Sequence, residues 1–318
     1  MTAHRPLLAR AHDAAFSDGV VHRVERAVIA VAFLGFLLHV GAIAAARWWP
    51  APPAVVAGVG TNFLGAIYTP FSVILFYEVL LLVAAFAEAT SRQMALQFEI
   101  ITLIVIRRVF KDFGAYGDPG GVVHEHAGFV ATVATDLGGS VLLVLLTALF
   151  HFARRRLPEA TAEEHEAIVR FKKSLALVLG VTLVGLVVFS AVRWVEAHSA
   201  AEDLGELHLG TAFYGDFFML LILMDVLVLV RSWRLLPSYG ALIRNSGFVI
   251  STILLRLAMT SPKPEHLVLA NLGVGFSIAI LVLTALLRRV TRDGDASHPP
   301  EAAEPVESEP MGARVAST

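Results

Sequence analysis

The stretch Ile101–Arg107 reads ITLIVIR, and the stretch Ile250–Arg256, in the second half of the chain, reads ISTILLR. Each is an apolar run that ends in an arginine, and each lies within a longer apolar segment. An apolar segment with an isolated charged side chain is typical of a helix in the interior of a membrane protein. The recurrence indicates that one structural unit occurs twice in the chain.

Three further matches lie in the same order along the chain, at a nearly constant spacing from their counterparts. They are AARW at 45–48 with AVRW at 191–194, YEVL at 77–80 with MDVL at 224–227, and DLG at 136–138 with NLG at 271–273. Apolar helices resemble one another easily, so a single match is weak. Four ordered matches that include charged residues predict an internal duplication.

The composition indicates a membrane protein. Of the 318 residues, 56% are apolar and 16% are charged, against about 25% charged residues in an ordinary soluble domain. A soluble protein of this size could not bury so much apolar surface, which excludes a secreted enzyme, a nucleic-acid-binding protein and a disordered scaffold. The formal net charge of −2 indicates no polyanionic partner. The chain has no cysteine, which excludes disulfides, thiolate metal sites and cysteine nucleophiles.

Eight segments are long and apolar enough to cross the ~30 Å core of a bilayer, which takes ~20 residues of helix. They are residues 27–49, 67–88, 94–112, 128–152, 174–195, 212–231, 241–260 and 267–288. With eight spans, all the basic clusters fall on one side of the membrane. These clusters run from Arg5 to Arg26, from Arg154 to Lys173 (including Lys172), from Arg231 to Arg244 and from Arg288 to Arg292. The positive-inside rule therefore predicts that both termini are cytoplasmic.

We therefore expect an all-α, multi-pass protein of a bacterial-type inner membrane, with two parallel four-helix repeats related by an axis along the membrane normal. Its predicted parts are a cytoplasmic N-terminal segment (1–26), a first membrane repeat (27–153), a charged cytoplasmic linker (154–173), a second membrane repeat (174–290) and a cytoplasmic tail (291–318). The tail is rich in proline, glutamate and serine, a composition that predicts disorder.

Charged residues within the spans are the main candidates for function, because each costs roughly 2.5–3.5 kcal/mol at the centre of a helix in lipid. Glu78 and Arg107 lie in the second and third spans, at depths that allow them to meet. Asp225 and Arg256 repeat this arrangement in the second copy, so we expect two buried acid–arginine pairs. Asp216 and Asp225 face opposite sides of one helix, so one of them is expected to point out of its own bundle toward the other repeat.

The first copy carries more polar residues than the second. Glu99 and Arg108 lie in its third span and Asp136 in its fourth, and Asp136 is replaced in the second copy by Asn271. This asymmetry predicts one functional half and one supporting half.

Neither a metal site nor a cofactor site is predicted. His124 and His126 lie in a glycine-rich outer loop and are weak metal candidates, because no third ligand is identifiable and such a pair in a loop is usually solvated. The sequence has no phosphate loop, no G-x-S-x-G and no H-E-x-x-H motif. We therefore expect no cofactor and no enzyme activity.

The second copy combines an acid in its second span with an arginine in its third and a short proline-containing link to its fourth. The residues concerned are MDVL at 224–227, the stretch 250–259 around Arg256, the link TSPK at 260–263 and the apolar run 267–287. In these features, residues 213–288 resemble the small four-span membrane proteins of the phosphate-starvation-inducible E family, with Asp225 where the family usually carries glutamate. The first copy fits the pattern through Glu78 and Arg107, and departs after Lys111 with a longer loop. The resemblance implies a fold and no defined chemistry.

Two functions remain open from the sequence. One is a small-ion or proton conduit, or a transporter, that uses Glu78, Arg107 and Asp136. The other is a non-catalytic, stress-linked membrane accessory or sensor module whose ion pairs are structural. The partners expected are the lipid bilayer, a small ion or proton, and a second copy or another membrane protein, but no nucleic acid.

Overall fold

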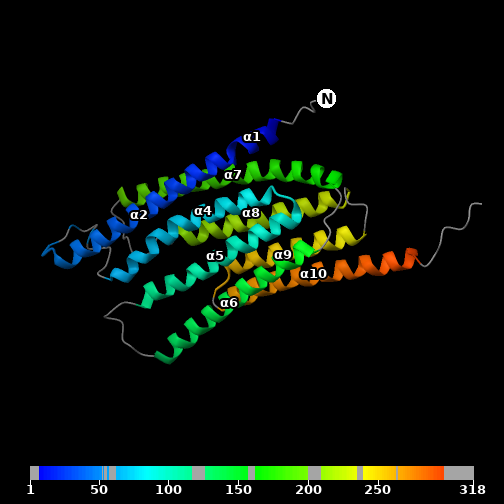
Figure 1. Ribbon diagram of the computed structural model, residues 1–318. Coiled ribbons are helices and arrows are strands. Elements are labelled where there is room, and N and C mark those ends of the chain that lie inside the picture. The colour runs from blue at the N-terminus through cyan, green and yellow to red at the C-terminus, as the bar shows by residue number, and fades with distance from the viewer. Residues whose placement is uncertain are drawn as a thin grey trace, which may run out of the picture.

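The computed structural model of the chain describes residues 7–51, 53, 56, 62–116, 126–156, 162–199, 209–234, 239–262 and 264–296. Every regular element in these ranges is a helix, which confirms the predicted all-α class. The elements are α1 (Leu7–Ala15), α2 (Asp18–Trp48), the short 3-10 helix η1 (Phe63–Ile67), α4 (Tyr68–Phe86), α5 (Thr90–Tyr116), α6 (His126–Arg156), α7 (Ala162–Ser199), α8 (Leu209–Ser232), α9 (Tyr239–Thr260) and α10 (Glu265–Ala296) (Figure 1).

Six helical stretches have the length and composition of membrane spans. They are Ala11–Trp48, Phe63–Phe86, Ala131–Arg156, Ile168–Phe189, Tyr239–Thr260 and Glu265–Leu287. Helices α5 and α8 are the two long helices that do not qualify over their described residues. The reason is their charge: α5 carries Glu99, Arg107 and Arg108 close together, and α8 carries Asp216, Asp225 and Arg231.

The helices pack in chain order within each half of the molecule. In the first half, α4 lies between α2 and α5, and α5 packs against α6. In the second half, α7 packs against α8, α8 against α9, and α9 against α10. The halves meet where α6 contacts α10, α5 contacts α9 and α4 contacts α7 (Figure 1). One apolar cluster runs through both halves, so the two cores are continuous.

Close packing of α9 on α10 depends on two glycines. A Cβ atom at Gly247 would lie 2.6 Å from Cγ1 of Ile280, and one at Gly273 would lie 3.2 Å from the carbonyl oxygen of Ser251. Small residues of this kind let helix backbones approach closely inside a membrane. Ser251 uses this proximity to donate a hydrogen bond to the carbonyl of Gly273 and to accept one from Ser277 at 2.7 Å.

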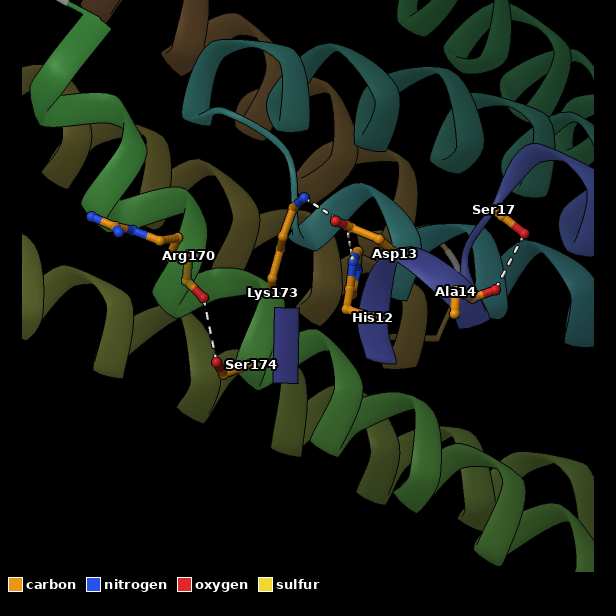
Figure 2. A network of polar contacts seen from close by, with 7 residues as sticks. All are labelled: His12, Asp13, Ala14, Ser17, Arg170, Lys173 and Ser174. Carbon is orange, nitrogen blue, oxygen red and sulfur yellow. Dashed lines mark hydrogen bonds and ion pairs between the residues drawn. The ribbon is translucent and has the colours of Figure 1, made fainter. Parts of the chain in front are cut away.

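Helix α7 extends further toward its N-terminus than the predicted span. It begins at Ala162, so residues 162–173 of the predicted linker are helical. Helix α1 packs against this part of α7, and Figure 2 shows Asp13 and Lys173 pointing toward one another, with 2.7 Å between Oδ1 and Nζ. The ring of His12 stacks on that of Phe16 beside this contact. Helix α1 is therefore docked on the helical bundle.

Candidate functional site

Asp225 of α8 and Arg256 of α9 form a buried ion pair. Nη1 of Arg256 donates to Oδ2 of Asp225 and, at 2.5 Å, to the carbonyl oxygen of Leu221. The hydroxyl of Thr252, one turn before Arg256, also donates to Oδ2 of Asp225 at 2.7 Å. The carboxylate thus receives two hydrogen bonds from one face of α9, which lowers the cost of its burial.

Lys172 of α7 is a second buried cation near this pair, and only 1% of the residue is exposed. Its Nζ donates to Oε1 of Gln93 at 2.6 Å, to Oγ1 of Thr90 at 3.2 Å and to the carbonyl oxygen of Glu88 at 3.3 Å. An ammonium group has three protons to donate, and here each has an acceptor. The three acceptors lie in the link between α4 and α5 and in the first turn of α5, so a cation from the second half is bound by the first half.

A small cavity joins Lys172 to Asp225. Its polar lining residues are Thr90, Gln93, Lys172, Asp225, Asn245 and Thr252. We call these residues, together with Arg256, the central cluster. The cavity volume of about 10 Å³ is at the lower limit for holding one water molecule. The cluster lies where α5 of the first half meets α7, α8 and α9 of the second, and it holds two cations, Lys172 and Arg256, beside one carboxylate.

Polar contacts of α9 extend from the cluster toward both ends of the helix. Nδ2 of Asn245, a member of the cluster, donates to Oγ of Ser232 at 2.6 Å. Near the other end of the helix, Arg108 of α5 donates to the carbonyl oxygen of Met259. From Asn245 to Met259 the helical rise amounts to about 21 Å, which is most of the ~30 Å thickness of a bilayer core.

Glu78 of α4 and Arg107 of α5 are also brought together. The Glu78 side chain is 4% exposed and that of Arg107 is 17% exposed. No hydroxyl or amide in the described ranges donates to Glu78. The position that matches Thr252 in the repeated stretch is Leu103, which has no donor and faces outward. The two ion pairs therefore share a geometry and differ in their surroundings.

The remaining polar residues of the first half are distributed over several contacts. Asp136 is buried in α6, where Oγ of Ser140 donates to its backbone carbonyl at 2.6 Å. Its counterpart Asn271 donates from Nδ2 to the carbonyl oxygen of Gly139 at 3.2 Å, which links α10 to α6. Glu99 is exposed and pairs with His151 of α6 at 2.9 Å. None of these contacts joins Glu99, Asp136 or Asn271 to the Glu78 pair.

Asp216 does not contribute to the interior, because it is exposed on α8. The carboxylate that faces residues of the other half is Asp225, across the cavity from Gln93. Of the two weak metal candidates, His124 and the side chain of His126 both lie outside the described residues. No group of three or more potential metal ligands occurs in the part of the chain that the structure describes.

The sequence analysis did not identify Lys172, Gln93 or Thr252 as site residues, and it assigned Lys172 to a cytoplasmic linker. In the structure Lys172 is buried within α7, inside the apolar stretch Ile168–Phe189. The sequence gives little sign of this, because nearly every residue of α7 from Leu175 to Val188 is apolar and no single face stands out. Where the side chains of α7 are described, the buried residues are Ile168, Lys172, Ala176, Leu179 and Leu183. This spacing is that of one helix face, and it places Lys172 in the buried stripe.

Comparison with known proteins finds no matching family model, no matching curated protein and no matching solved structure. Function has to be argued from the geometry of this chain.

Proposed function

We propose that this protein moves protons or a small ion across a membrane, through a polar interior centred on the central cluster. The observation that carries the proposal is the cavity between Lys172 and Asp225, in which ionisable groups from α7 and α8 adjoin room for a water molecule. Ionisable residues inside a membrane are expensive, and those that face a bundle interior commonly mark ion pathways or proton relays. The polar contacts that extend from the cluster to Ser232 and to the carbonyl of Met259 support a path beyond the cavity on either side.

The proposal includes the topology expected from the sequence. In it, α5 and α8 also cross the membrane, giving eight spans in two parallel repeats with both termini cytoplasmic. The same order of neighbours in the two halves supports this arrangement, as do the contacts of α5 with α9 and of α6 with α10, which are matched helices. We place the protein in a bacterial-type inner membrane and retain the resemblance to the phosphate-starvation-inducible E family as part of the proposal.

The test is ion flux in proteoliposomes made with the full chain. We expect Asp225→Asn to reduce flux at least about tenfold, because the neutral side chain cannot exchange a proton or balance a cation. Asp216→Asn is the matched control, since Asp216 lies on the same helix and is exposed. It should leave flux unchanged. A wild-type protein that passes neither protons, Na⁺, K⁺ nor Cl⁻ would contradict the proposal, as would equal flux through both variants.

A second function is favoured by the hydrogen bonding of the Asp225 pair. Thr252 and Arg256 both donate to Asp225, and Arg256 also donates to the carbonyl of Leu221. In this second reading, the sole role of the ion pair is to hold α8 and α9 together. The protein would then be a non-catalytic membrane accessory or sensor module. In that case Asp225→Asn changes thermal stability, and no ion flux is found for the wild type.

A further inference from the structure

The charges of the central cluster do not balance. Its charged side chains are those of Lys172, Asp225 and Arg256, and each of these residues is at most 3% exposed. The guanidinium of Arg256, a group that stays protonated in proteins, balances the carboxylate of Asp225. Of the described residues that line the cavity, only Asp225 is an acid, so the charge of Lys172 is in excess. A buried charge without a counter-charge is costly, and loss of one proton from Lys172 would make the cluster neutral.

The hydrogen-bond partners of Lys172 suit a neutral amine as well as an ammonium. As an ammonium, Lys172 donates one bond each to Gln93, Thr90 and the carbonyl of Glu88. A neutral amine has two N–H groups and one lone pair, so it needs two acceptors and one donor. The amide oxygen of Gln93 and the carbonyl of Glu88 accept, and the hydroxyl of Thr90, 3.2 Å from Nζ, can turn and donate. The same three groups therefore satisfy Lys172 in both protonation states.

Larger ions fit the cluster poorly. The cavity, at about 10 Å³, is at the lower limit for one water molecule. Na⁺ and K⁺ need oxygen ligands that replace their water, but the oxygens of Thr90 and Gln93 are already bonded to Lys172. The positive charges of Lys172 and Arg256 also repel a metal cation. Chloride is larger than water and would lie beside the carboxylate of Asp225. A proton requires neither the space nor the ligands.

We infer that the species that crosses the central cluster is a proton and that Lys172 carries it. This inference rests on the proposed function and names the substrate of the same site. In the first step an N–H bond of the ammonium breaks, its electron pair stays on Nζ, and the proton passes to a water molecule in the cavity. A second proton, arriving from the opposite side of the membrane, re-forms the bond. Lys172 then returns to its starting state and one proton has crossed the cluster.

Charged groups on three neighbouring elements act on this exchange. The carboxylate of Asp225 on α8 stabilises the ammonium, and the guanidinium of Arg256 on α9 opposes it. The partly exposed carboxylate of Glu88, in the link before α5, stabilises the ammonium from the solvent side, where its effect is screened. These opposing charges keep both forms of Lys172 accessible, which a group that gives and takes a proton requires.

The first test measures which species the wild type passes. The full chain is reconstituted in lipid vesicles that contain a dye for H⁺, Na⁺, K⁺ or Cl⁻, and flux is compared with that of protein-free vesicles. We expect proton flux above this background and no flux of the other three ions. A wild type that passes Na⁺, K⁺ or Cl⁻ as fast as protons, or faster, would overturn this inference and leave the proposed function standing. A wild type that passes none of the four contradicts the proposed function itself.

The second test asks whether Lys172 must release a proton. Lys172→Arg keeps the positive charge, but a guanidinium does not deprotonate, so we expect proton flux to fall at least about tenfold. Lys173→Arg is the matched control and should leave flux unchanged, because Lys173 pairs with Asp13 at 2.7 Å outside the cluster (Figure 2). Proton flux at the wild-type rate through Lys172→Arg would overturn the role of Lys172.

A milder pair of variants decides the question if Lys172→Arg does not fold. Thr90→Val removes the hydroxyl that donates to the neutral amine, and Thr90→Ser keeps it. We expect Thr90→Val to lower proton flux severalfold and Thr90→Ser to stay close to the wild type. Equal proton flux through these two variants would overturn the inference.

Discussion

Lys172 and Lys173 are adjacent in the sequence and have opposite environments. Lys172 lies in the interior and donates to the start of α5 and to the link before it, whereas Lys173 pairs with Asp13 of α1 at 2.7 Å (Figure 2). Successive residues of a helix are rotated by about 100°, so one residue of the pair faces the bundle and the other faces α1. The face of the helix on which a basic residue lies, rather than its membership of a charged cluster in the sequence, therefore decides whether it is buried or lies at the surface.

The hydroxyl of Thr252 should contribute measurably to stability. Thr252→Val keeps the shape of the side chain and removes the donor to Asp225, so we expect the free energy of unfolding to fall by about 1 kcal/mol. The measurement is reversible unfolding in mixed detergent micelles. Thr182→Val is the control, because the Thr182 hydroxyl donates only to the carbonyl of Val178 in its own helix. Equal losses in the two variants would show that the bond to Asp225 has no special role.

The Asp225 and Arg256 pair should behave as one unit. Removing one partner, as in Asp225→Ala or Arg256→Met, leaves an uncompensated buried charge and should cost about 3–5 kcal/mol of unfolding free energy. The charge-swapped variant Asp225→Arg with Arg256→Asp should recover part of that loss. The same unfolding assay reports both quantities. If the two single losses simply add in the double variant Asp225→Ala with Arg256→Met, direct coupling would be excluded.

At the scale of the helix, the close approach of α9 and α10 gives a steric prediction. Gly247→Ala forces Ile280 to move, since its Cγ1 would lie 2.6 Å from the new Cβ. We expect a net loss of about 1 kcal/mol, after the better helix propensity of alanine offsets part of the overpacking. Gly275→Ala, in α10, meets no atom within 4 Å and should be neutral or slightly stabilising. Thermal unfolding of both variants compares them, and similar midpoints would contradict the packing argument.

The sequence predicts the long apolar helices from their composition. It also predicts which acid pairs with which arginine, because that pairing follows from the depth of each residue along its helix. Glu78 and Arg107 lie on consecutive helices, as do Asp225 and Arg256, so chain order alone makes them neighbours. The bond from Lys172 to Gln93 could not be inferred this way. It depends on which helix of one half lies beside α7 of the other, and that is decided by packing between residues distant in sequence.

The charges of α5 and α8 also explain why the number of spans is harder to assign than the helical class. These helices would be costly in lipid as isolated segments. Within the bundle, Arg107, Asp225 and Arg108 face protein partners. Partners on neighbouring helices therefore lower the free-energy cost of burying these charges. A count of charges within one segment does not take such partners into account.

At the scale of the molecule, the proposed eight-span topology can be tested with single cysteines in the cysteine-free chain. Ser17→Cys and Arg155→Cys should be shielded from an impermeant maleimide added outside intact cells, and Ser261→Cys should be labelled. The labelling of Arg155→Cys shows whether α5 crosses the membrane. If α5 does not cross, α6 runs in the opposite direction and Arg155→Cys is labelled from outside. Labelling after cell lysis confirms that each thiol is reactive.

The ammonium of Lys172 joins the two halves in a way that makes them mutually dependent. A product truncated after α6 would leave the oxygen atoms of Thr90 and Gln93 without their donor, and the missing half on its own would leave the Lys172 ammonium without these acceptors. We expect each fragment to be less stable than the full chain. If the chain arose by doubling an ancestral gene, acquiring this lysine was a step that made a return to separate polypeptides costly, and membrane proteases would be expected to degrade either orphan.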